Sequence, residues 1–262
     1  LNQLLSSASE DTVTISDGTG NVLDTVTKTS TIDNDGPLCG NGKNLVINGE
    51  QARFIVGDNN WPAINFQILN LKSLTVTGTK EYNLWLRSTE STMQIGAEGG
   101  YLSSLDFSSG IKSEGKSLDI YAKNIQTGGS LQGTFSLHGI DSLKTSGDIV
   151  TLSAEDKILI TGASENSTVE AKRIQNADIG GGSVILGKAE SSLGAIDLSA
   201  GFWAKGEGSI DVYAEKINAG EIVVGNKGKS GVIRFNNPNQ TIITGKIGAG
   251  QDIEGNSVEI VG

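Results

Sequence analysis

The chain has almost no cysteine, histidine or proline. Its 262 residues include one cysteine, one histidine and three prolines. Because Cys39 is the only cysteine, an intrachain disulfide and a thiolate metal cluster built by one chain are both excluded. With three prolines against 36 glycines, the chain is neither a collagen nor a polyproline linker. Packing and hydrogen bonds therefore have to hold the fold.

Clustered positive charge and long apolar runs are missing too. Lys and Arg number 20 against 30 Asp and Glu, so the formal charge is −10. Binding a phosphate backbone needs clustered cations, and we therefore expect no nucleic-acid partner. No run approaches the ~20 apolar residues that span a bilayer, and residues 1–30 lack the pattern of a signal peptide. We expect a mature or cropped form, or a secretion signal that lies elsewhere.

Short runs of alternating Ile, Val and Leu are abundant. They include Leu74–Val76, Leu118–Ile120, Ile210–Val212 and Val258–Ile260. A period of two predicts strands, and no helix of ordinary length fits between the runs. The rhythm begins near residue 44, so we predict an irregular N-terminal cap, or first thin strands, over residues 1–43. The pattern indicates an all-β protein.

An internal repeat is the most informative feature. Ser117–Gly128 returns as Ser209–Gly220, with similar chemistry at nearly every position, and looser copies occur at 150–158 and 169–174. Each copy has alternating apolar residues, a small Ala, two polar residues and an Ile, which we interpret as a strand, a tight bend and the next strand. Repeats of this kind indicate stacked units.

Stacked units predict a parallel β-solenoid over residues 44–262. Each coil of ~20–30 residues would pair with its neighbours at ~4.8 Å, so that like residues stack in a narrow core. A β-sandwich or jelly roll is the alternative, and it needs hairpin turns. Asn48-Gly49 and Asp17-Gly18 are such turns near the beginning, but few occur after residue 110.

One sequence pattern, a predicted strand followed by Ala, two polar residues, Ile and Gly, recurs at Leu118–Gly128, Leu152–Gly162 and Ile210–Gly220. In this the chain resembles the passenger domains of bacterial autotransporters and the filamentous-haemagglutinin type of secreted exoproteins, over residues ~110–262. The resemblance implies a right-handed parallel β-helix and a non-enzymatic role in adhesion, aggregation or toxin delivery at a bacterial surface.

The same resemblance implies where the protein works and with what. It implies a secreted or outer-membrane-exposed segment, a translocator barrel in the parent protein, and a surface protein or glycan of a host or neighbouring cell as partner. Open strand edges at the ends of such a stack also predict self-association.

A carbohydrate-active enzyme, either a polysaccharide lyase or a glycoside hydrolase, is the alternative function. His138-Gly139 and Arg173 faintly resemble elements of polygalacturonases. Those enzymes also have an Asn-Thr-Asp segment and an Asp-Asp pair upstream of the His, and residues 90–138 contain no such pair. We therefore expect no catalytic residues and interpret His138 as an exposed side chain.

No cofactor or metal site is expected from the motifs. Asp33–Gly36 offers oxygen ligands at short spacing, but Gly42 stands where an EF-hand needs a Glu. A turn is the better interpretation. Gly180–Gly182 precedes a predicted strand and lacks the Lys and helix of a phosphate-binding loop, so it is interpreted as a corner.

Three tryptophans, Trp61, Trp85 and Trp203, raise one hypothesis about a ligand. Trp85 stands between Leu84 and Leu86, and alternation predicts that it points outward when they point inward. Exposed aromatic rings stack on sugars or anchor a protein partner. The alternative is that each tryptophan packs beneath a loop or caps an end. Trp85 is the candidate ligand-contact residue.

Overall fold

The computed structural model describes residues 6, 9, 11–16, 37–50, 52–57, 63–177, 181–225, 231–236, 238–249 and 257–261. Every element with defined bounds in these residues is a β-strand, which confirms the all-β class. The chain divides into two units, Leu1–Ser130 and Leu131–Gly262. The division predicted between residues 43 and 44 stays a prediction.

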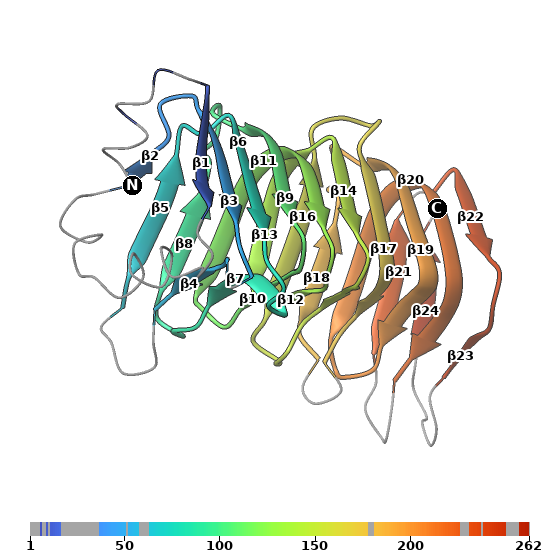
Figure 1. The fold of residues 1–262 in the computed structure, drawn as a ribbon. Helices are drawn as coiled ribbons and strands as arrows, with labels where there is room; N and C mark the ends of the chain where they lie inside the picture. The colour runs from blue at the N-terminus through green and yellow to red at the C-terminus, as the bar shows by residue number, and fades with distance from the viewer. Residues whose placement is uncertain are drawn as a thin grey trace. The chain divides into compact units, whose positions relative to one another are not determined.

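The strands are labelled in Figure 1 in chain order. Those of the first unit are β1 (Thr12–Ser16), β2 (Leu38–Cys39), β3 (Asn44–Asn48), β4 (Phe54–Val56), β5 (Asn65–Leu69), β6 (Ser73–Thr77), β7 (Tyr82–Leu86), β8 (Thr92–Ile95), β9 (Leu102–Phe107), β10 (Gly110–Ser113) and β11 (Ser117–Thr127). Those of the second unit are β12 (Leu131–Gly133), β13 (Phe135–Ile140), β14 (Ser142–Thr145), β15 (Asp148–Val150), β16 (Lys157–Gly162), β17 (Thr168–Gln175), β18 (Ser183–Leu186), β19 (Leu193–Ala204), β20 (Ser209–Val224), β21 (Val232–Asn236), β22 (Gln240–Ile243), β23 (Ile247–Ala249) and β24 (Ser257–Val261).

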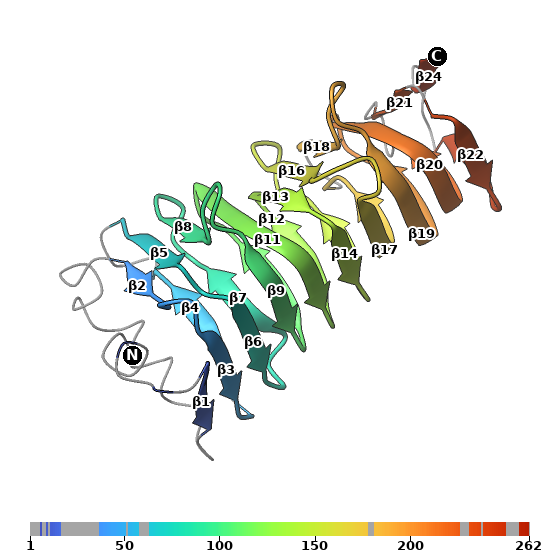
Figure 2. The same ribbon diagram turned by 90° about the horizontal axis from the view of Figure 1, so that it is seen from above.

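The first unit pairs its strands in parallel within two sheets. Sheet A holds the row β1–β3–β6–β9–β11 and the row β4–β7–β10. Sheet B holds β2–β5–β8–β11. Figure 2 shows β3, β6 and β9 as neighbouring arrows. Paired residues lie far apart along the chain: Asn44 and Ser73 are opposite in register, joined through their side chains, and 29 residues apart.

The second unit follows the same plan. In sheet A, β14, β17, β19, β20 and β22 form one row, while β15 joins β12 to β17 and β23 extends β20. In sheet B, β13, β16, β18, β20, β21 and β24 form a row. Asp211 and Arg234, which are opposite in register, lie 23 residues apart.

Inward residues stack on like residues to form the core of each unit. Within a ladder each aliphatic side chain covers the next, and full burial of one such side chain contributes about 1.5–3 kcal/mol. Two inward ladders, one in each unit, have every member at most 1% exposed: Leu45, Leu74, Leu105 and Ile125; Ile149, Ile174, Phe202 and Ile222.

The internal repeat has a direct structural counterpart. β11 and β20 both begin at the first residue of their copies. Over eleven residues from that start, the order of buried, half-buried and exposed side chains is identical in the two strands. The repeat therefore encodes which side chains enter the core.

The bend expected inside each copy does not divide it into two strands. β11 pairs with β8 of sheet B through residues 117–120 and with β9 of sheet A through residues 122–127. β20 does the same, pairing with β18 in sheet B and β19 in sheet A. One continuous strand thus belongs to both sheets, and the alternation shifts by one residue after the Ala, where two residues outside the core separate Ala122 from Ile125.

The predicted fold, a right-handed parallel β-helix with an irregular N-terminal cap, is therefore wrong as a description of this chain. Shared strands wrap one parallel sheet around the core of each unit, in the manner of a parallel β-barrel with additional strands. Within residues 1–43, where an irregular cap or first thin strands are expected, β1 pairs with β3 and β2 pairs with β5. Alternation reveals the inward face of a strand, but it leaves open how strands connect around the core.

Candidate functional site

Trp85 lies on the outward side of β7. Its neighbours Leu84 and Leu86 are fully buried, while Trp85 is half-buried. Parallel pairing sets it between Ile55 of β4 and Lys112 of β10. The sequence predicts this outward position, and the register adds the residues on either side.

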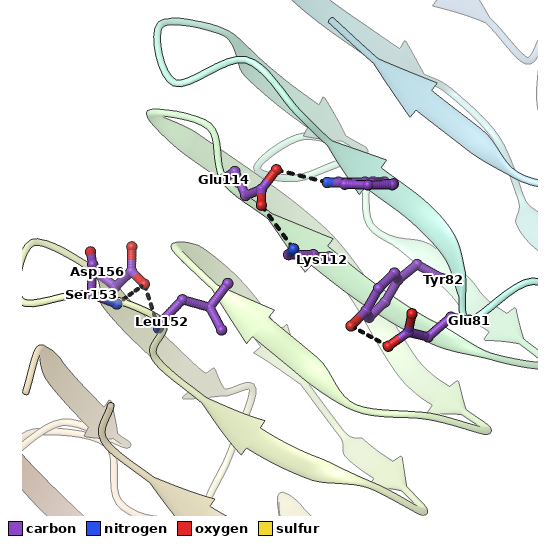
Figure 3. Close-up of polar contacts among 8 residues, drawn as sticks. Glu81, Tyr82, Lys112, Glu114, Leu152, Ser153 and Asp156 are labelled. Atoms are coloured by element: carbon purple, nitrogen blue, oxygen red, sulfur yellow. Dashed lines mark hydrogen bonds and ion pairs between the residues drawn. The ribbon is translucent and has the colours of Figure 1, made fainter. Parts of the chain in front are cut away.

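A hydrogen bond fixes the indole ring of Trp85. Its Nε1 donates to Oε2 of Glu114, just past β10, over 3.0 Å. The other carboxylate oxygen of Glu114 pairs with Nζ of Lys112 over 2.8 Å, as Figure 3 shows. The Glu114 side chain is 36% exposed and that of Lys112 21%. Carboxylate, ammonium and indole therefore hold one another in place.

The surroundings of Glu114 keep it ionised. Burial raises the pKa of Glu114, but hydrogen bonds from Lys112 and Trp85, with the positive charges of Lys112 and Arg87, act in the opposite direction. The pKa is consequently lowered from its ordinary value of 4.5. An ionised carboxylate that already accepts two hydrogen bonds is a positioning group and a poor general acid.

A second aromatic ring and two cations complete the group. The rings of Tyr82 and Trp85 have centroids 6.2 Å apart and planes inclined at 57°. The guanidinium carbon of Arg87 lies 4.8 Å from the centroid of the Trp85 ring, and Nζ of Lys112 lies 5.1 Å from it. The hydroxyl of Tyr82 donates to Glu81 over 2.7 Å (Figure 3). We call Tyr82, Trp85, Arg87, Lys112 and Glu114 the Trp85 cluster.

This arrangement is suited to binding rather than to bond cleavage. Fixed aromatic rings present an apolar surface, with cations beside them for polar or anionic groups. Only Trp85 of these residues is singled out by sequence reasoning. Glu114 is 29 residues from Trp85 along the chain, and the parallel register alone brings the two together.

Trp203 in the second unit has comparable neighbours. Its Nε1 donates to Oε1 of Glu221 over 2.8 Å. The guanidinium carbon of Arg173 lies 3.4 Å from the ring centroid, and Nζ of Lys205 lies 4.2 Å from it. Arg173 also pairs with Asp148 over 3.6 Å. Both cations thus lie closer to the Trp203 ring than Arg87 and Lys112 lie to that of Trp85. Trp61, the third tryptophan, lies outside the described residues.

The residues considered for catalysis are not brought together. His138 is in β13 of sheet B, whereas Arg173 is in β17 of sheet A and stacks on Trp203. Asp33–Gly36 lies outside the described residues, as does Gly180. Gly181 and Gly182 have φ values of 92° and 88° just before β18, as a corner requires.

Two carboxylates do lie on neighbouring strands elsewhere. Glu170 and Asp197 are opposite in register on β17 and β19. They border an open polar hollow of about 380 Å³, together with Thr145, Ser146, Ala171, Lys172 and Ser199. Glu170 pairs with Lys144 over 3.0 Å, and Asp197 accepts from Nδ2 of Asn218 over 3.3 Å. Sequence reasoning missed this pair because the strands' register is needed to see it.

One turn could be mistaken for a ligand site. Oδ2 of Asp156 accepts from the backbone N–H groups of Leu152 and Ser153, over 2.6 and 2.9 Å (Figure 3). Its other oxygen accepts from the hydroxyl of Thr134 over 2.9 Å. Both carboxylate oxygens are therefore engaged, Oδ2 in closing the turn and Oδ1 with Thr134.

The described residues contain neither a metal-binding cluster nor a membrane-spanning helix. No group of three or more His, Cys, Asp or Glu side chains there is arranged to hold a metal ion. The described part of the chain also has no helix of sufficient length and apolarity to cross a membrane.

Comparison of the sequence with protein-family models and curated proteins, and of the structure with solved structures, found no match.

Proposed function

We propose that the chain is a non-enzymatic, extracellular adhesive segment that binds a glycan through the Trp85 cluster. The observation that carries the proposal is the pair of outward rings, Tyr82 and Trp85, held 6.2 Å apart on one face of sheet A. Sugars present flat C–H faces that stack on such rings. Rings already held by protein contacts lose little conformational freedom on binding.

The internal hydrogen bonds support a binding role for these rings. The polar atoms of both are already used, Nε1 of Trp85 by Glu114 and the hydroxyl of Tyr82 by Glu81. A ligand therefore meets ring surface and cations instead of free ring donors. Acid–base catalysis at this place has little support, since Glu114 is ionised and engaged.

Location and parentage are part of the same proposal. The absence of disulfides, the acidic charge and the resemblance to bacterial passenger domains support a secreted or cell-surface location, with a translocator barrel in the parent protein. A surface glycan or protein of a host or neighbouring cell is the proposed partner. Labelling of intact producing cells by an antibody against the folded chain tests the location; labelling only after lysis would contradict it.

A glycan array tests the binding function directly. We expect the purified chain to bind a subset of glycans, and Trp85→Ala to lower the affinity at least about tenfold, because an aromatic anchor is lost. Trp85→Phe keeps a smaller aromatic ring for stacking and loses the bond to Glu114, so it should retain more of the affinity than Trp85→Ala.

Tyr101→Ala is the matched control. Tyr101 is also half-buried and belongs to the first unit, where it contacts Tyr121 and Lys123. This variant should bind as the wild type does. Equal binding by wild type and Trp85→Ala, with circular dichroism unchanged, would refute the proposed site.

A carbohydrate-active enzyme is the second candidate, favoured by the carboxylates beside the polar hollow. Glu170 and Asp197 are side by side on adjacent strands, as paired carboxylates of glycosidases are near one another. Assays for reducing sugar and for unsaturated products on common polysaccharides decide this. If the chain cleaves a polysaccharide, and Glu170→Gln and Asp197→Asn each abolish the cleavage, the enzymatic proposal replaces the adhesive one.

A further inference from the structure

We infer that the ligand of the Trp85 cluster is an acidic saccharide, one that carries carboxylate or sulfate groups, and that Arg53 and Arg87 recognise its charge. The inference rests on the proposed glycan-binding function and goes further by naming the class of glycan. It is drawn from the guanidinium groups around the rings, which form no ion pair among the described residues.

The register places three cations around one outward face of the first unit. Ile55, Trp85 and Lys112 are in line across β4, β7 and β10. Arg53 precedes Ile55 by two residues, so alternation puts it on the same outward side. Along the strand direction it lies at nearly the same height as Tyr82. Arg87 follows Trp85 by two residues on the same side. The cations therefore flank the rings along the strand direction.

The carboxylates of the cluster do not neutralise both guanidinium groups. Glu114 pairs with Lys112, and Glu81 accepts from Tyr82. Within the described part of the chain, neither Arg53 nor Arg87 takes part in an ion pair. The side chain of Arg87 contacts the Trp85 ring, and Nε of Arg53 is buried without a hydrogen-bond partner.

Guanidinium groups beside aromatic rings, without a carboxylate partner among the described residues, point to an anion. Guanidinium groups match carboxylate and sulfate oxygens with two parallel hydrogen bonds, so they discriminate by geometry as well as by charge. Because the chain as a whole carries a charge of −10, these cations are a local exception and not part of a basic surface.

The aromatic rings favour a saccharide over an acidic peptide as the occupant. Tyr82 and Trp85 offer two ring surfaces, and stacking on both suits consecutive sugar rings. Arg53 and Arg87 then lie on either side of the stacked rings, where acidic substituents of those sugars would project. A neutral glycan would gain the stacking and leave both guanidinium groups without a charged partner.

Matched pairs of saccharides test the inference. Oligogalacturonate is compared with its carboxyl-reduced form, and dextran sulfate with dextran, so that each pair differs only in the anionic group. By calorimetry we expect at least one acidic form to bind about tenfold or more tightly than its neutral partner, as charge-assisted hydrogen bonds predict. The pair that shows the difference identifies carboxylate or sulfate.

Two variants assign the charge recognition to named residues. Arg87→Gln and Arg53→Gln should each reduce the acidic-to-neutral ratio to less than about threefold, because each removes a guanidinium that would form charge-assisted hydrogen bonds with the acidic group. Lys72→Gln removes an exposed cation elsewhere in the first unit and should leave the ratio intact. Circular dichroism of each variant verifies folding.

The outcomes separate this inference from the function on which it rests. Equal affinity for acidic and neutral forms, or an unchanged ratio in both arginine variants, would overturn the inference while glycan binding stands. No binding of any saccharide would refute the proposed function itself. Binding of polyaspartate that Arg87→Gln removes, without saccharide binding, would assign the cluster to acidic peptides and overturn both.

Discussion

The guanidinium carbon of Arg173, in β17, lies 3.4 Å from the centroid of the Trp203 ring in β19. Arg173 also pairs with Asp148 of β15, and the two side chains are only 17% and 21% exposed. The contact thus joins three strands of sheet A, and it places both charges where water reaches them poorly. Such a pair is worth more than an exposed one, because removing one partner leaves the other poorly solvated.

We therefore expect Arg173→Met to lower the free energy of unfolding by about 1–3 kcal/mol, through loss of the ring contact and of the charge partner of Asp148. Urea denaturation measures the change. The control is Lys144→Met, whose side chain is 61% exposed in its pair with Glu170. It should cost less than about 1 kcal/mol. Equal losses for the two variants would contradict a special role for the Arg173–Trp203 contact.

Stability should depend on pH through Glu114. Its pKa is lower in the folded chain than the ordinary 4.5, so ionised Glu114 favours folding. This contribution is complete above the pKa of the unfolded chain and is lost as the pH falls through the lower, folded pKa. Glu114→Gln keeps an acceptor for Trp85 and removes the charge. We expect the variant to melt below the wild type at pH 7, and the difference to shrink at pH 3.

Thermal melts at a series of pH values make this measurement. Glu50→Gln is the control. Glu50 is an exposed carboxylate of the first unit, so the loss of its charge should change the melting temperature little. A difference between wild type and Glu114→Gln that stays constant from pH 7 to pH 3 would show that charge is not the cause.

Much of the local structure was accessible from the sequence, as Leu84, Trp85 and Leu86 illustrate. Their alternation predicts which side chains are buried, and the structure agrees. The repeat at Ser117 and Ser209 likewise predicts two equivalent segments, and their side chains are buried in the same order. Both features are local properties of a strand, since burial of every second side chain follows from backbone geometry.

The sequence does not reveal the register between paired strands or how the strands connect around the core. Glu114 lies beside Trp85 only because β10 pairs with β7 in one register, and the clear repeat begins after these strands. No repeat therefore indicates the spacing in residues 44–110. Within the repeat, Ala122 marks a bend in a continuous strand and not the end of one, because backbone pairing with β9 continues through Thr127.

Gly96 is expected to be essential to the packing of β11 on β8. Its φ is 75°, and a Cβ built there would lie 2.5 Å from the backbone oxygen of Tyr121 and 2.9 Å from Cδ1 of Leu102. Gly99 has a similar φ of 78°, with nothing within 4 Å of such a Cβ. The two positions share the cost of a positive φ, and only Gly96 adds a backbone clash.

Gly99→Ala should therefore lower the free energy of unfolding by about 1 kcal/mol, and Gly96→Ala by about 1–3 kcal/mol more. Denaturant titration of both variants gives the two values. If they proved equal, the close approach to Tyr121 would have no energetic consequence.

Asn83 is a polar side chain in the core of the first unit, fully buried in β7. Its Oδ1 accepts from the backbone N–H of Ser109 over 2.7 Å, and its Nδ2 donates to the carbonyl of Ala52 over 3.2 Å. The Asn83 side chain therefore satisfies backbone groups on both sides of β7: the Ala52 carbonyl just before β4 and the Ser109 N–H just before β10. The register between β7 and β10 shifts beside it, between Gly110 and Ile111, where the regular ladder cannot satisfy every group.

Asn83→Ala removes both bonds and also the one that Oδ1 accepts from the hydroxyl of Ser108. It leaves the Ala52 carbonyl unsatisfied in a buried place and the Ser109 N–H unsatisfied in a half-buried one. We expect a loss of about 2–4 kcal/mol in the free energy of unfolding, since each buried unpaired group costs about 1–3 kcal/mol. Asn65→Ala is the control: Asn65 is exposed and accepts one hydrogen bond, from Thr92. It should cost less than about 1 kcal/mol. Comparable losses would mean that water replaces Asn83, and that the shift in register does not depend on its amide.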